Sequence, residues 1–125
     1  MDITPEIPAD RKYIDNYGDG GFRVSGERYE GSVIVMPEQV LAWPVSTLAE
    51  LNAESVVAVL AAEPAIELLL IGCGTRVERI PKDVRDALLA GAIIVDGMES
   101  GAACRTYNVL MAEERRVAAA LIAID

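Results

Sequence analysis

The stretch "AIELLLIGCGTR", residues 65–76, is an apolar run that ends abruptly in Gly-Cys-Gly. Its core, 66–71, is short and nearly free of charge, which is typical of a strand buried on both faces of a sheet. A second run, "AIIVDGM" at 92–98, has the same character and predicts a second buried strand at 93–97. Because a helical segment lies between the two runs, we expect parallel strands joined by a right-handed crossover.

The helix between these strands is marked at both ends, by Pro81 where it begins and by Gly91 where it ends. Beyond the second strand, Ser100 is suited to cap a helix over 101–113, and "RRVAAALIAI" predicts a last strand. The order is therefore strand, helix, strand, helix, strand. This order indicates a parallel βαβ core over residues 65–124.

The N-terminal half has a different character. Residues 12–45 read as short antiparallel strands, and Gly31 inside "GERYEGSVIVM" indicates a bulge or bend. An Ala-rich segment then predicts one broken helix or two short ones, stopped by Pro64. We therefore expect one α/β domain over residues 11–125, with a mixed sheet and a β-rich N-terminal layer. Residues 1–10 are expected to form a flexible arm.

Composition excludes several classes of function. The chain has 125 residues, the ordinary size of one domain, and its net charge is −9. Its basic residues are scattered, so nucleic acid and an anionic membrane surface are both unfavourable partners. The N-terminal residues do not resemble a secretory signal, and no apolar run is long enough to insert in a membrane. These features predict a soluble, cytoplasmic protein.

The residue types needed for common catalytic and metal sites are scarce. There is no histidine, which excludes Ser-His-Asp and Cys-His catalysis and any His-ligated metal. Two cysteines, Cys73 and Cys104, do not make a disulfide framework or a four-cysteine zinc site. Asp96 and Glu99 are close in sequence, but carboxylates on a loop are commonly just solvated. The sequence predicts no catalytic residue, no metal and no cofactor.

The two glycine-containing loops are the best candidate for a ligand or partner pocket. If the strands at 66–71 and 93–97 are parallel neighbours, both loops leave the same edge of the sheet, where α/β proteins usually bind ligands. Unpaired amides at the start of the following helix favour an anion, and two arginines could add hydrogen bonds. The candidate residues are Gly72, Cys73, Gly74, Thr75, Arg76, Ser100, Gly101, Ala102, Arg105, Thr106 and Asn108.

Simpler interpretations compete with each of these features. "GCG" is neither a dinucleotide fingerprint nor a Walker A loop, and glycines after a strand usually form a turn. Ser100 is better suited to cap a helix than to act as a nucleophile, because no base is near it in sequence. Cys73 and Cys104 form a reactive thiol pair only if the loops converge; otherwise they are small apolar residues of the core.

Three segments carry a resemblance to a known family. They are "RYEGSVIVMPEQVLAWPV", "IELLLIGCGT" and "GMESGAACRTYNVLMAEERRVAAAL", with "ACRTYN" the most specific part. They resemble the small domain family of mitochondrial complex I (NADH:ubiquinone oxidoreductase) assembly factor 3 and its bacterial and archaeal relatives. The resemblance implies a three-layer β/β/α fold and no established chemical activity. The family usually has Gly-Thr-Gly where this chain has Gly72-Cys73-Gly74, and it often has Gly where this chain has Glu114.

Three hypotheses follow, in order of preference. The first is a non-catalytic protein that binds a protein partner, in respiratory complex assembly or in membrane-protein insertion, with a homodimer as a further option. This partner class is implied by the resemblance, since the eukaryotic relatives are assembly helpers and some bacterial ones are encoded beside protein-export genes. The second is a small-anion or nucleotide-binding domain, or an enzyme, that uses the two glycine loops. The third is a thiol redox switch.

Overall fold

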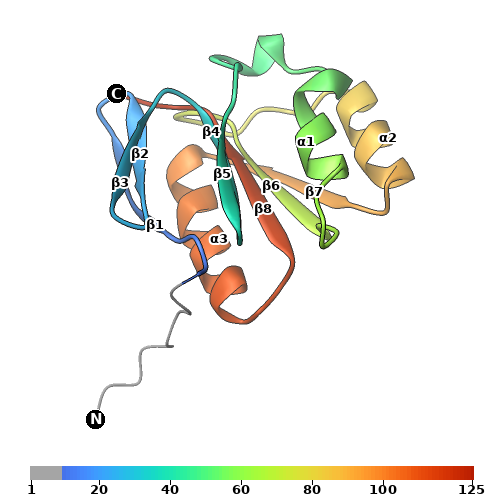
Figure 1. The fold of residues 1–125 in the computed structure, drawn as a ribbon. Coiled ribbons are helices and arrows are strands. Elements are labelled where there is room, and N and C mark those ends of the chain that lie inside the picture. The colour runs from blue at the N-terminus through green and yellow to red at the C-terminus, as the bar shows by residue number, and fades with distance from the viewer. Residues whose placement is uncertain (1–9) are drawn as a thin grey trace.

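The chain forms a small antiparallel sheet and a larger mixed sheet (Figure 1). The computed structural model describes residues 10–125, so the expected arm at 1–10 lies almost wholly outside the described residues. The small sheet holds β1 (Ile14–Gly18), β2 (Gly21–Val24) and β3 (Glu27–Glu30), in that order. The large sheet has the order β5-β4-β8-β6-β7 and consists of β4 (Val33–Met36), β5 (Gln39–Ala42), β6 (Leu68–Gly72), β7 (Ile94–Met98) and β8 (Val117–Leu121).

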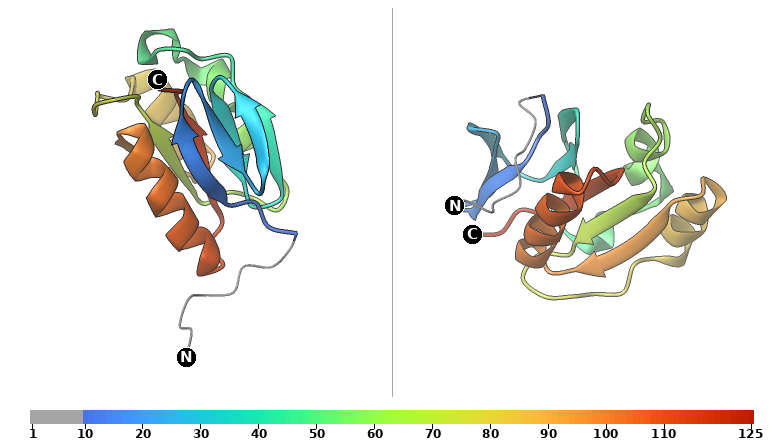
Figure 2. Two further views of the ribbon diagram at one scale, coloured as in Figure 1. Left: turned by 90° about the vertical axis from the view of Figure 1, so that its left-hand side faces the viewer. Right: turned by 90° about the horizontal axis from the view of Figure 1, so that it is seen from below.

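Helices cover both faces of the large sheet. Two 3₁₀ turns, η1 (Leu48–Glu50) and η2 (Ala53–Val56), lead into the short α1 (Val57–Leu60), which confirms the expected broken helix. The two longer helices are α2 (Lys82–Ala90) and α3 (Ser100–Ala112). Figure 2 shows α3 and the small sheet on one face of the large sheet, with α1 and α2 on the other. None of the helices within residues 10–125 is long and apolar enough to cross a bilayer.

The predicted parallel core is confirmed. In β6, Leu70 pairs in parallel with Asp96 of β7 on one side and with Ala119 of β8 on the other. Strand β8 also pairs antiparallel with β4, so the sheet is mixed, as expected. The N-terminal strands form the predicted β-rich layer, and Gly31, with φ of 79°, lies where the chain passes from the small sheet to the large one.

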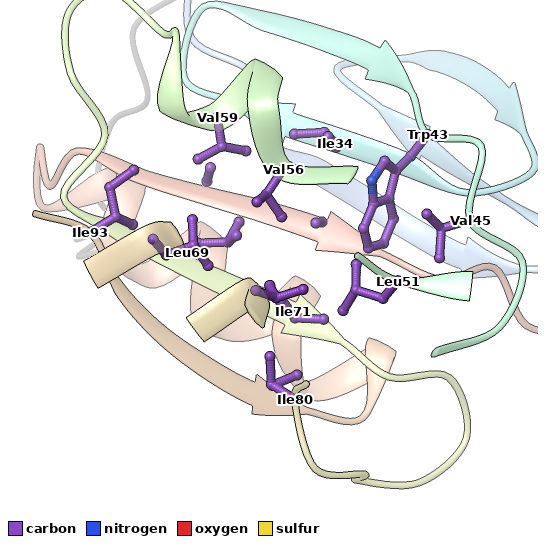
Figure 3. Close-up of a cluster of buried hydrophobic side chains, with 14 of the residues drawn as sticks. Ile34, Trp43, Val45, Leu51, Val56, Val59, Leu69, Ile71, Ile80 and Ile93 are labelled. Atoms are coloured by element: carbon purple, nitrogen blue, oxygen red, sulfur yellow. The ribbon is translucent and has the colours of Figure 1, made fainter. Parts of the chain in front are cut away.

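Strand β8 is the centre of the molecule, and every residue from Val117 to Leu121 has a relative exposure of 0%. Ala118 and Ala120 belong to the hydrophobic cluster under α1 and α2, which also contains Trp43, Val56, Leu69 and Ile71 (Figure 3). Ala119 belongs to the cluster under α3 and the small sheet. Methyl side chains on both faces of one strand let the layers above and below it approach closely.

Strand β7 differs from the expectation of a second doubly buried strand. It lies at the edge of the sheet, and Ile94 is 68% exposed although the residue is strongly apolar. The reason is the strand order. Strand β8 lies between β4 and β6, so β6 has β8 on one side and β7 on the other, and β7 has only β6 as a neighbour. An edge strand and a central strand can have equally apolar sequences, so this correction depends on topology.

Helix α3 ends in a Schellman turn with a glutamate where glycine is the usual residue. The amide of Arg115 donates to the carbonyl of Leu110 (3.0 Å), and the amide of Glu114 donates to that of Met111 (3.0 Å). These are the two hydrogen bonds of a Schellman motif, with Glu114 at the left-handed position and a φ of 65°. A side chain there is strained, and an acidic one also opposes the helix dipole.

We predict that Glu114→Gly stabilises the fold. Relief of left-handed strain exceeds the added entropy of the unfolded chain, so we expect a gain of about 0.5–1 kcal/mol in the free energy of unfolding. Guanidinium denaturation followed by circular dichroism measures it. The matched control is Ala112→Gly in the last helical turn, which should destabilise by up to about 1 kcal/mol. A loss of stability in the Glu114→Gly variant would contradict this account of the turn.

Candidate functional site

The two glycine loops meet at the carboxyl ends of β6 and β7, as the sequence predicted. The amide of Cys73 donates to the carbonyl of Met98 (2.7 Å), and the amide of Ser100 donates to that of Gly74 (2.8 Å). Gly74 and Gly101 also line one hollow of about 150 Å³, together with Tyr17, Thr75, Glu99 and Ile124. The two loops therefore form one shared rim at this edge of the sheet.

Ser100 is a buried residue that holds the backbone together, and it is not the cap of α3. The cap position is Glu99, which makes no side-chain capping bond, and Ser100 is the first residue of α3. Its hydroxyl donates to the carbonyl of Ile122 (2.7 Å) and accepts from the amide of Gly74 (3.0 Å). The side chain is fully buried. Ser100 therefore joins the ends of β6, α3 and β8, and the expected capping role is wrong.

Gly72 is required by this junction. A Cβ atom at Gly72 would lie 2.9 Å from the Cα of Ser100 and 3.0 Å from its hydroxyl. Both distances are shorter than ordinary carbon contacts, so a side chain at Gly72 would push the helix away from the strand. The first glycine of "GCG" thus serves close packing. The second, Gly74, has a φ of 98° and forms the turn.

The start of α3 is covered by Tyr17 of β1. A Cβ atom at Gly101 would lie 2.4 Å from the hydroxyl oxygen of Tyr17, so the tyrosine occupies the space over the first turn. Gly101 is buried, Ala102 is half-buried, and the amide of Ser100 already donates to Gly74. The expected row of open amides, which would hold an anion, is covered at Gly101.

The two arginines expected beside this anion do not converge. Arg105 lies on the β1 side of α3, where its guanidinium approaches the hydroxyl of Tyr17 (3.4 Å) and lines a 270 Å³ hollow with Asp15 and Asn108. Arg76 is exposed on its loop and is not among the residues that line either hollow. The anion hypothesis stays a prediction, without the paired arginines that favoured it.

The "ACRTYN" segment is mainly structural. The side chain of Asn108 accepts from the amide of Ile14 and donates to its carbonyl, both at 2.8 Å, and so attaches β1 to α3. The buried Tyr107 hydroxyl donates to the carbonyl of Lys12 (2.9 Å). Ala103 and Cys104 lie in the core, and Thr106 is half-buried. Four of the six residues thus position the small sheet or fill the space beneath it.

A larger groove opens beside the rim, and the sequence did not predict most of it. We call it the rim groove; its volume is about 380 Å³, within the 300–1,000 Å³ of small-ligand sites. It is lined by Ser46, Thr47, Leu48, Cys73, Gly74, Thr75, Glu78, Ile122, Ala123, Ile124 and Asp125. The rule that loops after parallel strands meet at the carboxyl edge of the sheet predicts only the part of the groove formed by residues 73–75. No local signal shows that residues 46–48 and 122–125 return to the same edge.

The charges along the rim groove oppose anion binding. Glu78 and Asp125 are both exposed there, and among the described residues that line it none is basic. Three hydroxyl side chains, those of Ser46, Thr47 and Thr75, add donors and acceptors without charge. The rim groove therefore favours a neutral polar or a basic group.

The two cysteines do not form the thiol pair that the redox-switch hypothesis requires. Cys73 belongs to the cluster under α1 and α2, and Cys104 belongs to the cluster under α3, on the opposite face of the large sheet. Both thiols are free and buried. Burial raises the pKa of Cys104 to about 12 and also raises the pKa of Cys73. The structure therefore favours the interpretation that both cysteines are small apolar residues of the core.

Comparisons with known proteins identify the family of the chain. The family model described as "protein of unknown function (DUF498/DUF598)" matches residues 14–122, and the chain belongs to that family. NADH dehydrogenase (ubiquinone) 1 alpha subcomplex assembly factor 3 of Xenopus tropicalis is 33% identical over 91% of this chain and 62% of its own length. The chain thus spans about three-fifths of that curated relative.

Bacterial proteins match over more of their own length. An uncharacterized protein of Rhodobacter capsulatus is 33% identical over 87% of this chain and 82% of its own. A crystal structure described as an outer membrane protein from Bartonella henselae is 39% identical, with a TM-score of 0.86 over 94% of this chain and 98% of that one. The α/β fold that the family resemblance implied is therefore confirmed.

We predict that Ser100→Ala strongly destabilises the domain. The substitution leaves the amide of Gly74 and the carbonyl of Ile122 unpaired in a buried place, so we expect a loss of about 2–4 kcal/mol in the free energy of unfolding. Urea denaturation measures it. Ser46→Ala is the control, because Ser46 is exposed and should change stability by less than about 0.5 kcal/mol. Equal effects of the two substitutions would show that Ser100 does not hold the rim.

We also predict that both thiols are unreactive in the native protein. With a pKa of about 12, only about one Cys104 side chain in ten thousand is a thiolate at pH 8. Labelling by a thiol reagent at that pH should be slow and should rise about tenfold per pH unit, whereas guanidinium should release two fast thiols per chain. Single variants, Cys73→Ser and Cys104→Ala, assign each phase. Fast labelling of Cys104 in the native protein would restore the thiol-switch hypothesis.

Proposed function

We propose that this member of the family is a non-catalytic protein-binding domain that assists the assembly of a respiratory complex of the NADH dehydrogenase type. The proposal rests first on the curated relatives, whose printed names describe assembly factors of that dehydrogenase. Their similarity covers 91% of this chain, so the shared part is this whole domain. A role in assembly needs a partner surface and no reactive group.

The observation that carries the proposal is the chemical state of the rim. Ser100 is buried and uses its hydroxyl to hold the backbone together. Both thiols are buried with raised pKa values, and Tyr17 covers the start of α3. Ser100 and the two thiols thus have structural roles, whereas the rim groove beside Ser100 is open.

The rim groove suits a polar, basic segment of a partner protein. Its exposed carboxylates, Glu78 and Asp125, attract lysine or arginine side chains, and its three hydroxyls can pair with backbone groups. Its volume of about 380 Å³ is enough for a few side chains of a partner. The same carboxylates disfavour the alternative in which the glycine loops hold a nucleotide or another small anion.

The first test is genetic. Deleting the gene from its native cell should lower the amount of assembled NADH dehydrogenase on native gels and the NADH:quinone oxidoreductase activity of the membranes, and the wild-type gene should restore both. Normal assembly without the chain would contradict the proposed role. Should membrane-protein insertion fail instead, the partner belongs to the insertion machinery.

We predict that Thr75→Arg fails to restore assembly whereas Val77→Arg succeeds. Both residues are exposed on one loop, but only Thr75 lines the rim groove. An added guanidinium there repels a basic partner segment and should weaken binding by at least about tenfold. The melting temperatures of both purified variants provide the control for folding. If both variants restore assembly equally, the assembly role stands but the rim groove is not its surface.

A further inference from the structure

A second polar site lies at the other end of β8 from the rim groove. Three of the eleven basic residues of the chain, Arg11, Arg115 and Arg116, line one hollow of about 110 Å³, which we call the arginine hollow. Its remaining lining residues are Pro37, Met111, Ala112 and Glu114. Figure 1 shows this end of the molecule as the turn that joins α3 to β8, below the sheet.

The guanidinium of Arg116 is held in a fixed orientation. It donates to the carbonyls of Pro64 (2.7 Å) and Ala65 (3.3 Å) and to both carboxylate oxygens of Glu38 (2.6 and 3.1 Å). Arg11 contacts the same carboxylate. The hydrogen bond from Arg116 is the main reason that the pKa of Glu38 is lowered, so Glu38 is ionised at neutral pH. This rigid arrangement needs little reordering when it binds a ligand.

Arg115 is the cation that remains available. It is exposed, and among residues 10–125 it takes part in no ion pair. Its backbone is fixed by the Schellman turn, through the hydrogen bond of its amide to Leu110 (3.0 Å). Counting the three arginines against Glu38 and Glu114 leaves the cluster with a net charge of 3 − 2 = +1, although the whole chain carries −9.

We propose that the arginine hollow binds one oxyanion group, a phosphate or a carboxylate, through the Arg115 guanidinium and the one Nη1–H of Arg116 that is left over from its bonds to Glu38, Pro64 and Ala65. The guanidinium of Arg115 presents parallel N–H donors that match two oxygens of such a group, and the Nη1–H of Arg116 adds one more donor. A volume of 110 Å³ is well below the 300–1,000 Å³ of whole-metabolite sites, so the hollow takes a single charged group. This site is independent of the rim groove and of the assembly role.

The test is a titration of the full chain with inorganic phosphate, followed by the amide NMR signals of residues 11–12 and 114–117. Saturable millimolar binding that weakens with added salt is expected. Arg115→Gln should weaken it by at least about tenfold, because a charge-assisted hydrogen bond is lost. Glu114→Gln should strengthen phosphate binding, because it removes a negative charge that repels the phosphate. Arg79→Gln, at an exposed arginine outside the hollow, should leave it unchanged.

Parallel titrations with sulfate and acetate identify the source of the oxyanion. Tighter binding of phosphate and sulfate than of acetate points to a phosphoryl group, and the reverse points to an acidic side chain; both support the site. Absence of saturation with all three ions overturns the proposal. Equal binding by the wild type and Arg115→Gln, with unchanged melting temperatures, also overturns it, because the shifts would then reflect only ionic strength.

Discussion

The burial of β8 on both faces is the constraint on which the rest of the structure depends. Each of its five residues is fully buried, and three of them are alanines. Alanine has a low intrinsic preference for strands, so the strand forms because its neighbours on both edges and both faces require it. Larger side chains at Ala118 or Ala119 would separate the helical layers from the sheet. The hydroxyl of Ser100 then holds the end of this strand, at Ile122, to the first turn of α3.

The sequence predicted those parts of the fold that follow from local patterns. Two short apolar runs with a helix between them indicated the parallel pair β6 and β7, and the edge rule brought Gly74 and Gly101 to one rim. The edge position of β7 was not predictable, because the run at 92–98 is as apolar as a central strand. Its place depends on where β8 inserts, and a long-range pairing of this kind leaves no mark on the local sequence.

The candidate site illustrates the same limit. Six of the eleven residues that line the rim groove lie before η1 or after β8, and no spacing rule connects them with "GCGT". The buried role of Ser100 was hidden as well, since a serine before a helix is most often its cap. The inward direction of the Ser100 hydroxyl becomes clear only from its hydrogen bond to the carbonyl of Ile122, a residue distant in sequence. The segment with the most specific family resemblance, "ACRTYN", proved to attach the small sheet to α3 through Asn108 and Tyr107. Similarity in this segment therefore reports the fold more directly than it reports a reaction.

The two polar sites lie at opposite ends of β8, and this placement determines which partners could contact both of them. Five residues of a strand span about 17 Å, so no single small ligand can reach from the arginine hollow to the rim groove. The charges at the two ends also differ in sign, because Glu78 and Asp125 line one and three arginines line the other. A partner with one basic and one acidic or phosphorylated element would match both ends in a single orientation, whereas a partner with only one of them would match only one end. If the proposed function holds, opposite charges at the two ends of a rigid strand would orient a partner as well as bind it.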